Sequence, residues 1–182
     1  MAEHQLHKKV GELLKKIAEE NDFDLRLDEA CEDIQCKKKQ QIPLFLDKKG
    51  RENNFCKVDA MLLEGKEIAV VIEIEESKDD PTIIFGKYLT TAMSDCYIRG
   101  KDDIKIANKS VRFIQIIDTK NQNEPKTKMK EKYLLIEKKI NENLYGCVKS
   151  YKIICVNGKR IKENDEDFKK FQKDLTDTLK EV

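Results

Sequence analysis

Apolar residues recur along this chain with two different spacings, and the change of spacing separates expected helices from expected strands. A spacing of three to four residues with a charged opposite face predicts helices at 3–21, 81–98, 128–143 and from about 165 onward. Short alternating or continuous apolar runs predict strands at 42–46, 54–63, 68–75, 111–118 and 148–156. This order of elements predicts an α/β protein with a mixed central sheet flanked by helices.

Turn and capping residues mark where several of these elements should begin or end. A turn at 64–67 should join the two strands around it into a hairpin. Asp80 as the N-cap and Pro81 at the first helical position predict the start of the second helix. Asn157 and Gly158 predict a further hairpin ahead of the C-terminal helix.

Length and charge set bounds on the class of protein. The chain has 182 residues, enough for one well-buried domain, and we interpret 1–182 as a single domain. Charged residues make up 39% of the chain, but the net charge is only +1, so there is no global basic signal for nucleic acid. No apolar run approaches the ~20 residues of a membrane span, and no apolar segment opens the chain. We therefore expect a cytoplasmic protein without a membrane partner.

The six cysteines should then be reduced, because disulfides are rare in the cytoplasm. Cys31, Cys36 and Cys56 do not follow a zinc-finger spacing, and only His4 and His7 could add imidazole ligands. We interpret the cysteines as small, partly buried thiols, with a zinc site as the less favoured alternative.

Three acidic residues occupy strands that are otherwise apolar. Asp59 lies within the strand at 54–63, and Glu73 and Glu75 lie two residues apart near the end of the strand at 68–75. Alternate strand residues point to the same face, so Glu73 and Glu75 should lie together, and hairpin pairing would bring Asp59 to them. Converging carboxylates repel one another unless a hard cation with oxygen ligands lies between them.

An interpretation without a metal is that these acids point outward from a half-exposed edge and pair with Lys57 or Lys66. It accounts well for Glu76, which we expect to be an exposed residue whose removal has little effect. It accounts less well for Glu73, because the apolar run at 68–72 is typical of a central, buried strand.

The placement of these acids resembles the PD-(D/E)XK nuclease superfamily, which includes restriction endonucleases and junction resolvases. The resemblance covers about 3–118 and rests on Val58-Asp59 in place of Pro-Asp, and on Glu73-Ile74-Glu75 in place of acid-x-Lys. It implies a restriction endonuclease-like fold with a C-terminal extension, 119–182, that contains the expected hairpin and helix.

The sequence departs from the superfamily pattern at Glu75, where a lysine is the commoner residue. Some restriction enzymes of the superfamily have acid-x-Glu, and a lysine from the following helix is a second solution. Lys87, about two turns into that helix, is the candidate. Its alternative interpretation is a solvent-facing lysine in a lysine-rich protein.

The resemblance implies a metal-dependent endodeoxyribonuclease, restriction-like or repair-like, that uses Mg²⁺ or Mn²⁺. Asp59, Glu73, the carbonyl of Ile74 and Glu75 would hold metal or act on water, and Lys87 would stabilise negative charge on the phosphate. Glu20, at the end of the first helix, is a candidate to reach toward the carboxylate cluster, although a solvated glutamate is the simpler interpretation.

Binding partners are less well specified by the sequence. Basic residues ahead of the acidic strands are candidate DNA contacts, and they also fit a solvated surface: Lys37, Lys38, Lys39, Lys48, Lys49 and Arg51. Cleavage of both DNA strands by a one-site domain needs two copies, so we expect a homodimer, with contacts from 148–181. The alternative is a non-catalytic nucleic-acid-binding or assembly protein on the same fold, which the missing lysine at position 75 favours.

Overall fold

The structure, a computed structural model, describes seven stretches of the chain: 5–32, 41–47, 53–76, 80–99, 102–119, 126–157 and 165–180. They contain four helices: α1 (Gln5–Asn21), α2 (Pro81–Ala92), α3 (Lys126–Glu142) and α4 (Glu166–Lys180). They also contain nine strands: β1 (Asp24–Leu27), β2 (Ile42–Phe45), β3 (Asn54–Val58), β4 (Ala60–Glu64), β5 (Glu67–Glu75), β6 (Cys96–Arg99), β7 (Asp102–Lys105), β8 (Val111–Asp118) and β9 (Val148–Val156). The predicted α/β class is confirmed.

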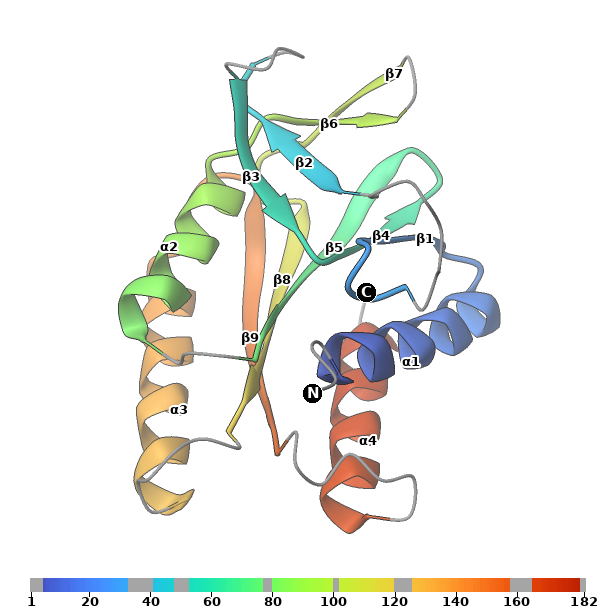
Figure 1. Cartoon of the computed structure of the whole chain (residues 1–182). Coiled ribbons are helices and arrows are strands. Elements are labelled where there is room, and N and C mark those ends of the chain that lie inside the picture. Colours follow the sequence, from blue (N-terminus) through green and yellow to red (C-terminus); the bar gives the residue numbers. More distant parts are fainter. Residues whose placement is uncertain are drawn as a thin grey trace.

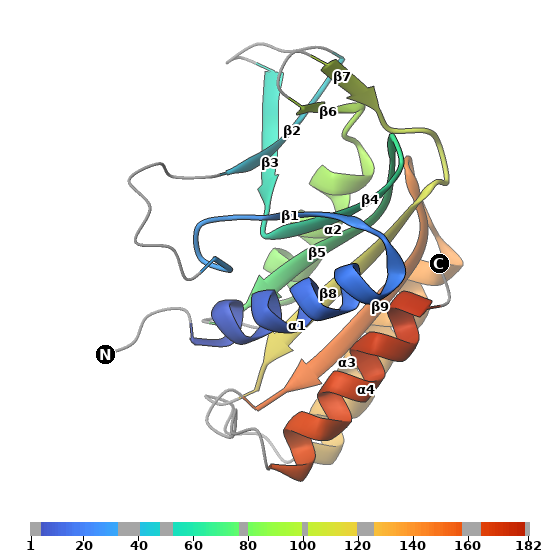
Figure 2. The same ribbon diagram turned by 90° about the vertical axis from the view of Figure 1, so that its right-hand side faces the viewer.

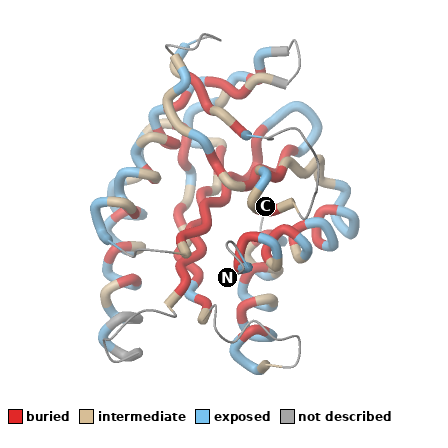
Figure 3. The backbone as a smooth tube through the Cα atoms, in the orientation of Figure 1, coloured by how far each residue is buried: buried red, intermediate tan, exposed pale blue. Residues whose placement is uncertain are grey.

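The main sheet has five strands in the order β1-β4-β5-β8-β9. The pairs β1–β4 and β4–β5 are antiparallel, whereas β5–β8 and β8–β9 are parallel, so the predicted mixed sheet is confirmed. Central β5 is buried at every position after its first, as a strand covered on both faces should be. Figure 3 shows this buried backbone running through the middle of the molecule.

Helices cover both faces of the main sheet. Helices α2 and α3 lie on one side and α1 and α4 on the other (Figures 1 and 2). Each face has its own apolar core, and the alternation along β5 divides its residues between them: Val71 packs toward α2 and α3, and Ile72 and Ile74 pack toward α1 and α4. Burial of each such side chain contributes about 1.5–3 kcal/mol to stability.

A second sheet of four antiparallel strands, in the order β3-β2-β6-β7, lies above the main sheet in Figure 1. The prediction of one continuous strand at 54–63 is therefore wrong. Strand β3 pairs with β2 in the second sheet, and β4 pairs with β1 and β5 in the main sheet. Asp59 is the residue where the chain crosses from one sheet to the other, and its carbonyl accepts a hydrogen bond from the Asp28 N–H at 2.9 Å.

Helix α2 begins as predicted and ends earlier than predicted. The Asp80 carboxylate accepts a hydrogen bond from the Thr82 N–H at 2.7 Å, and Pro81 follows the cap. The helix stops at Ala92, whose carbonyl accepts the Cys147 N–H at 3.0 Å. Beyond it, Cys96–Arg99 forms strand β6, because this apolar segment pairs with β2 and β7 instead of continuing the helix.

The resemblance led us to expect that the C-terminal part of the chain is an extension outside the core. Its described residues belong to the core instead. Strand β9 pairs in parallel with β8 along its whole length, and four apolar residues of α4 pack under the sheet: Phe168, Phe171, Leu175 and Leu179. The predicted second strand of a C-terminal hairpin falls in 158–164, outside the described residues. The described part of this segment therefore belongs to the main sheet and its core.

The outer edge of β9 is covered by side chains of α3. The Asn141 side chain bonds both the N–H and the carbonyl of Tyr151, at 3.0 and 2.8 Å, and Glu137 accepts the Ile153 N–H at 2.8 Å. These bonds replace those of a further strand, so this part of the edge is protected against pairing with another chain. None of the described helices is long and apolar enough to cross a membrane.

Candidate metal and catalytic site

The predicted acids meet at the C-terminal end of β5. Beyond Ile72 the ladder between β4 and β5 ends, and the Asp59 side chain takes over: its Oδ2 accepts the Ile74 N–H at 2.6 Å. The break between β3 and β4 thus directs the carboxylate of Asp59 onto the strand that carries Glu73 and Glu75. The structure brings these residues together at one strand end, as the sequence predicts.

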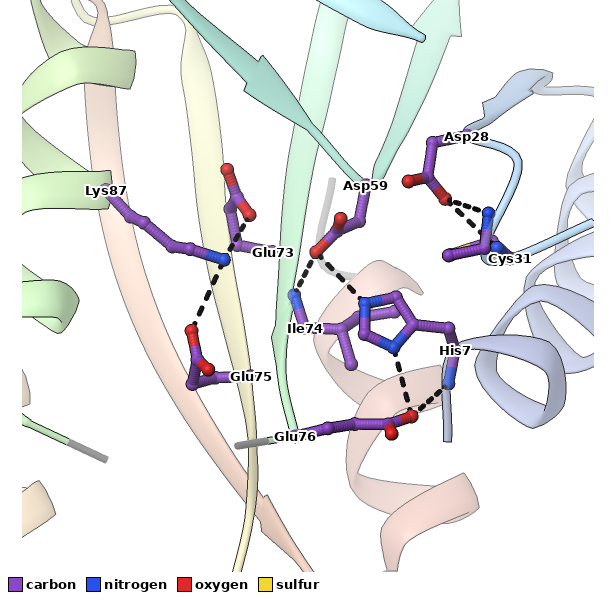
Figure 4. Close-up of polar contacts among 10 residues, drawn as sticks. His7, Asp28, Cys31, Asp59, Glu73, Ile74, Glu75, Glu76 and Lys87 are labelled. Atoms are coloured by element: carbon purple, nitrogen blue, oxygen red, sulfur yellow. Dashed lines mark hydrogen bonds and ion pairs between the residues drawn. The ribbon is translucent and has the colours of Figure 1, made fainter. Parts of the chain in front are cut away.

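On the α2 side of β5, Lys87 is the partner of the two glutamates. Its Nζ lies 2.9 Å from Oε2 of Glu73 and 3.4 Å from Oε2 of Glu75 (Figure 4). Glu73 is almost completely buried, with 4% of its side chain exposed, whereas 30% of the Lys87 side chain is exposed. The ammonium group therefore reaches a buried carboxylate from a position that is open to solvent on one side.

On the α1 side of β5, His7 lies between Asp59 and Glu76. Its Nδ1 and its backbone N–H each lie 3.0 Å from Oε1 of Glu76, and its Nε2 lies 3.6 Å from Oδ2 of Asp59 (Figure 4). Both side chains are largely buried, so the expectation that Glu76 is exposed is wrong.

Sequence reasoning missed His7 and the contact of Glu76, although both carried a signal. His7 is in helical register with Val10 and Leu14 on the apolar face of α1, and all three residues are buried. Glu76 continues the alternation that sends Ile72 and Ile74 toward α1. The missing step was to match a polar residue on a buried helix face with a polar residue on the strand face it covers.

Burial strongly affects the charge of Glu73. Removal from water, followed by the negative charge of Asp59, raises the pKa of Glu73 to about 8, against an ordinary value of 4.5. Burial alone would also raise the pKa of Asp59, but the contacts with His7, Lys87 and the Ile74 N–H hold it below the usual value. The pKa of Asp59 thus favours its carboxylate form, whereas burial opposes the ionisation of Glu73 even with the ammonium group of Lys87 beside it.

The acids in turn shift the pKa values of both basic partners. Burial alone would lower the pKa of Lys87, but the charges of Glu73 and Asp59 raise it. Burial likewise opposes the positive charge on His7, yet the hydrogen bonds and charges of Asp59 and Glu76 raise its pKa. The positive charge of each basic group is therefore favoured by two acidic neighbours.

The donor atoms at the strand end fit a divalent cation in kind. Carboxylate oxygens come from Asp59, Glu73 and Glu75, and hard cations also accept backbone carbonyls. The N–H and carbonyl of a strand residue point to the same edge, so the Ile74 carbonyl faces the edge where Asp59 has replaced the β4 ladder.

The same donors are not arranged as a complete metal site in this conformation. Among the described residues, no three histidine, cysteine, aspartate or glutamate side chains are grouped so that they could hold a metal ion. The contacts explain this, because Lys87 lies between Glu73 and Glu75, and His7 lies between Asp59 and Glu76. A cation would have to displace the ammonium group of Lys87 from Glu73.

Other predicted site residues lie elsewhere. Glu20 is exposed near the end of α1, about 20 Å along the helix from His7 at ~1.5 Å per residue, so the structure does not bring it to the acids. The candidate DNA contacts all fall outside the described residues: Lys37, Lys38, Lys39, Lys48, Lys49 and Arg51.

A groove of about 710 Å³ runs along β9 between α3 and α4, and its lining includes Tyr151, Glu137 and Phe171 but none of the acids at the end of β5. No protein-family model, curated protein or solved structure matches this chain.

Proposed function

We propose that this protein is a metal-dependent endonuclease that hydrolyses phosphodiester bonds of DNA. The observation that carries the proposal is the contact of Lys87 with Glu73 and Glu75, next to Asp59, at the end of a buried strand. A lysine and several acids at one strand end are the groups that the superfamily motif requires. Here the lysine comes from α2 and not from position 75.

The residues have distinct tasks in this proposal. A bound divalent cation supplies charge neutralisation and an activated water at the scissile phosphate. Asp59, Glu73 and the Ile74 carbonyl would hold the cation, and Glu75 would hold a second cation or accept a proton from water. Lys87 would turn from the two glutamates toward the phosphate oxygens, where negative charge develops. Its partly exposed, flexible side chain is suited to that movement.

DNA as the substrate, and a homodimer as the active form, follow from the resemblance and remain predictions. The near-neutral net charge does not conflict with DNA binding, because only one face of a protein must be basic. Light scattering with and without DNA tests the dimer. A monomer under all conditions would favour cutting of one strand over cutting of both.

A non-catalytic binding protein on the same scaffold is the second candidate, and one observation favours it. Each acid at the end of β5 already has a basic partner within the chain, either Lys87 or His7, so the cluster is charge-paired without a metal. A protein that never bound a cation would be stable with this arrangement.

Incubation of the purified protein with plasmid, single-stranded and branched DNA in Mg²⁺ or Mn²⁺ tests the proposal. We expect cation-dependent cleavage that is abolished in Asp59→Ala and in Glu73→Ala, because loss of a ligand removes the ion. Glu64→Ala, an exposed acid at the end of β4, is the matched control and should keep full activity. An absence of cleavage of all three DNAs, together with no cation binding in calorimetry, would leave the binding protein.

A further inference from the structure

The outer face of helix α2 carries no charged side chain, although charged residues make up 39% of the protein. Lys87 is the only charged residue in Pro81–Ala92, and its side chain turns back to Glu73 and Glu75. By contrast, every exposed residue of α4 is a lysine, an aspartate or a glutamate. A surface helix normally has charged and polar residues opposite its core face, so α2 departs from the pattern of its own fold.

Four large apolar or aromatic residues form an exposed patch on this face. Phe85, Leu89 and Met93 follow one another at intervals of four residues, so they lie in a row along α2 and its C-cap, and 37%, 45% and 45% of these residues are exposed. Tyr145, which is 57% exposed, lies beside this row, because its backbone N–H donates a hydrogen bond to the hydroxyl oxygen of Tyr88 at 2.8 Å. We call Phe85, Leu89, Met93 and Tyr145 the outer patch.

Gly86 lies in the middle of the outer face of α2, and no packing within the chain requires a glycine there. A Cβ at this position would meet no atom of the described residues within 4 Å outside its own stretch of helix, whereas at Gly11 and Gly146 it would collide with backbone. Glycine in a helix interior is less stable than alanine, but it lets another backbone come close. Thr90, one turn later, donates its hydroxyl to the carbonyls of Gly86 and Lys87 at 3.0 and 3.1 Å, so it needs no water. These features suit a face on which another helix packs.

The size of the outer patch fits the centre of a dimer interface. Its four residues together expose roughly 400 Å², within the range of about 300–600 Å² for the largest apolar patch on a typical monomer. Two such patches supply about 800 Å², and a standard interface between two proteins buries about 1,600 Å², of which somewhat more than half is apolar. Aromatic residues and methionine are also enriched in interface centres.

We propose that the outer patch is covered by the outer patch of a second copy of this chain, so that α2 packs on α2 across a two-fold axis near Gly86. In a two-fold contact a surface faces itself, and a charge near the axis would meet its own like charge. A face without charge therefore suits a second copy, whereas a different protein could match lysines and acids with opposite charges. The inference deepens the proposed function and rests on it for the purpose of the second copy, because cleavage of both DNA strands needs two sites.

This contact leaves the proposed catalytic site open in each copy. Lys87 is two residues from both Phe85 and Leu89, so at ~100° per residue it lies on nearly the opposite side of α2 from them. Its side chain reaches Glu73 at the end of β5, away from the outer patch. A dimer joined through α2 would therefore have two separate sites, one for each strand of a duplex.

Sedimentation velocity over a range of concentrations tests the contact in the full chain. We expect a dimer for wild type, and Leu89→Lys should weaken self-association about 30-fold or more, the usual result of losing a central interface residue. Leu134→Lys makes the same change at a leucine on α3 that is 52% exposed, and it should dimerise as wild type does. A monomeric wild type, or equal effects of the two substitutions, would overturn the proposal.

Gly86→Leu separates a fitted helix contact from general apolar adhesion. It adds apolar surface to α2, but its side chain fills the space that the partner helix needs, so association should weaken. Stronger association would contradict the close approach of two helices. Because this side chain would meet no other part of the described chain, circular dichroism should show a normally folded protein.

Mixing variants of opposite charge identifies the occupant of the patch. Leu89→Glu and Leu89→Lys should each be monomeric alone, since each places like charges across the axis, and together they should form a mixed dimer. Recovery of the dimer on mixing shows that the patch faces itself. Two variants that stay monomeric when mixed would show that it does not.

The outcomes separate this inference from the proposed function. If wild type dimerises through the outer patch but cleaves no DNA with Mg²⁺ or Mn²⁺, the inference stands and the nuclease fails. If wild type is a monomer that nicks DNA, the nuclease stands and the inference fails. Where both hold, Leu89→Lys should still nick single strands of plasmid DNA and should lose about 10-fold or more of its double-strand breaks.

Discussion

At the end of β5, each face of the strand carries one basic group between two acids, but the two basic groups are held in different ways. On the α2 face, Lys87 contacts Glu73 and Glu75 with a long side chain that is partly exposed. On the α1 face, His7 contacts Asp59 and Glu76 with a short, buried ring that is bonded through both side chain and backbone. Each face therefore holds one basic group between two acids, but only the α2 face can release its cation easily.

This difference indicates a division of tasks. A flexible ammonium group can exchange a carboxylate for a phosphate at little cost, because its head already reaches solvent. A ring whose side chain and backbone are both bonded to Glu76 cannot move far. In the proposed function the α2 face thus supplies the mobile ammonium group, and the α1 face holds Asp59 in place.

Among changes to the two faces, removal of Lys87 should have the largest effect on turnover. Lys87→Met should lower turnover about 10²- to 10³-fold, the usual result of losing a group that stabilises negative charge in a transition state. Steady-state cleavage assays measure this, with Lys66→Met in the exposed β4–β5 turn as the control. Turnover near that of wild type would mean that Lys87 only neutralises Glu73 and Glu75.

Moving the lysine from α2 to β5 makes the test sharper. The single variant Glu75→Lys should lose activity, because it places a second ammonium group next to Lys87. In the double variant Glu75→Lys/Lys87→Met one lysine remains, now at the commoner position of the motif. It should recover on the order of 10-fold in turnover relative to Lys87→Met. No recovery would show that the origin of the lysine matters as much as its charge.

Changes to Glu76 affect the α1 face and should have a smaller effect. Glu76→Ala removes the acceptor of two hydrogen bonds from His7, so we expect a loss of about 1 kcal/mol in unfolding free energy. Urea unfolding measures this effect. Glu19→Ala, an exposed acid on α1, should leave the unfolding free energy unchanged. Equal results for the two variants would contradict a role for Glu76.

The smallest expected effect is on the way the unfolding free energy of the metal-free protein depends on pH. The pKa of Glu73 is raised from 4.5 to about 8 in the folded protein, so ionisation is harder in the folded than in the unfolded state, and stability should fall as pH rises between these values. His7 acts in the same direction, because its raised pKa gives stability that is lost as pH rises through it. Glu73→Gln should therefore flatten the decline but not abolish it. Unfolding by urea at pH 5, 6.5 and 8 measures the slope, and an unchanged slope would contradict the assignment.

Much of the α2 face could be predicted from the sequence. Glu73 and Glu75 share a face because strand residues alternate, and Lys87 lies on the helix that follows the same strand. The α1 face could not be predicted in the same way, because His7 and Glu76 are separated by 69 positions and contact one another only when α1 packs across the sheet. The turn after β1 packs closely on α1 because residue 11 is glycine, where a Cβ would collide with the Cys31 carbonyl oxygen.

The sequence by itself determined the elements whose pattern is local: the amphipathic α1 and α4, the apolar β5 and β8, and the capped start of α2. Tertiary structure alone decided which strand an apolar segment pairs with when more than one partner strand was available. Thus 54–63 divides at Asp59 because its halves pair in different sheets, Cys96–Arg99 joins β2 instead of extending α2, and β9 joins β8. The physical reason is that periodicity records which side of an element is buried, whereas the choice of partner depends on contacts between segments far apart in the chain.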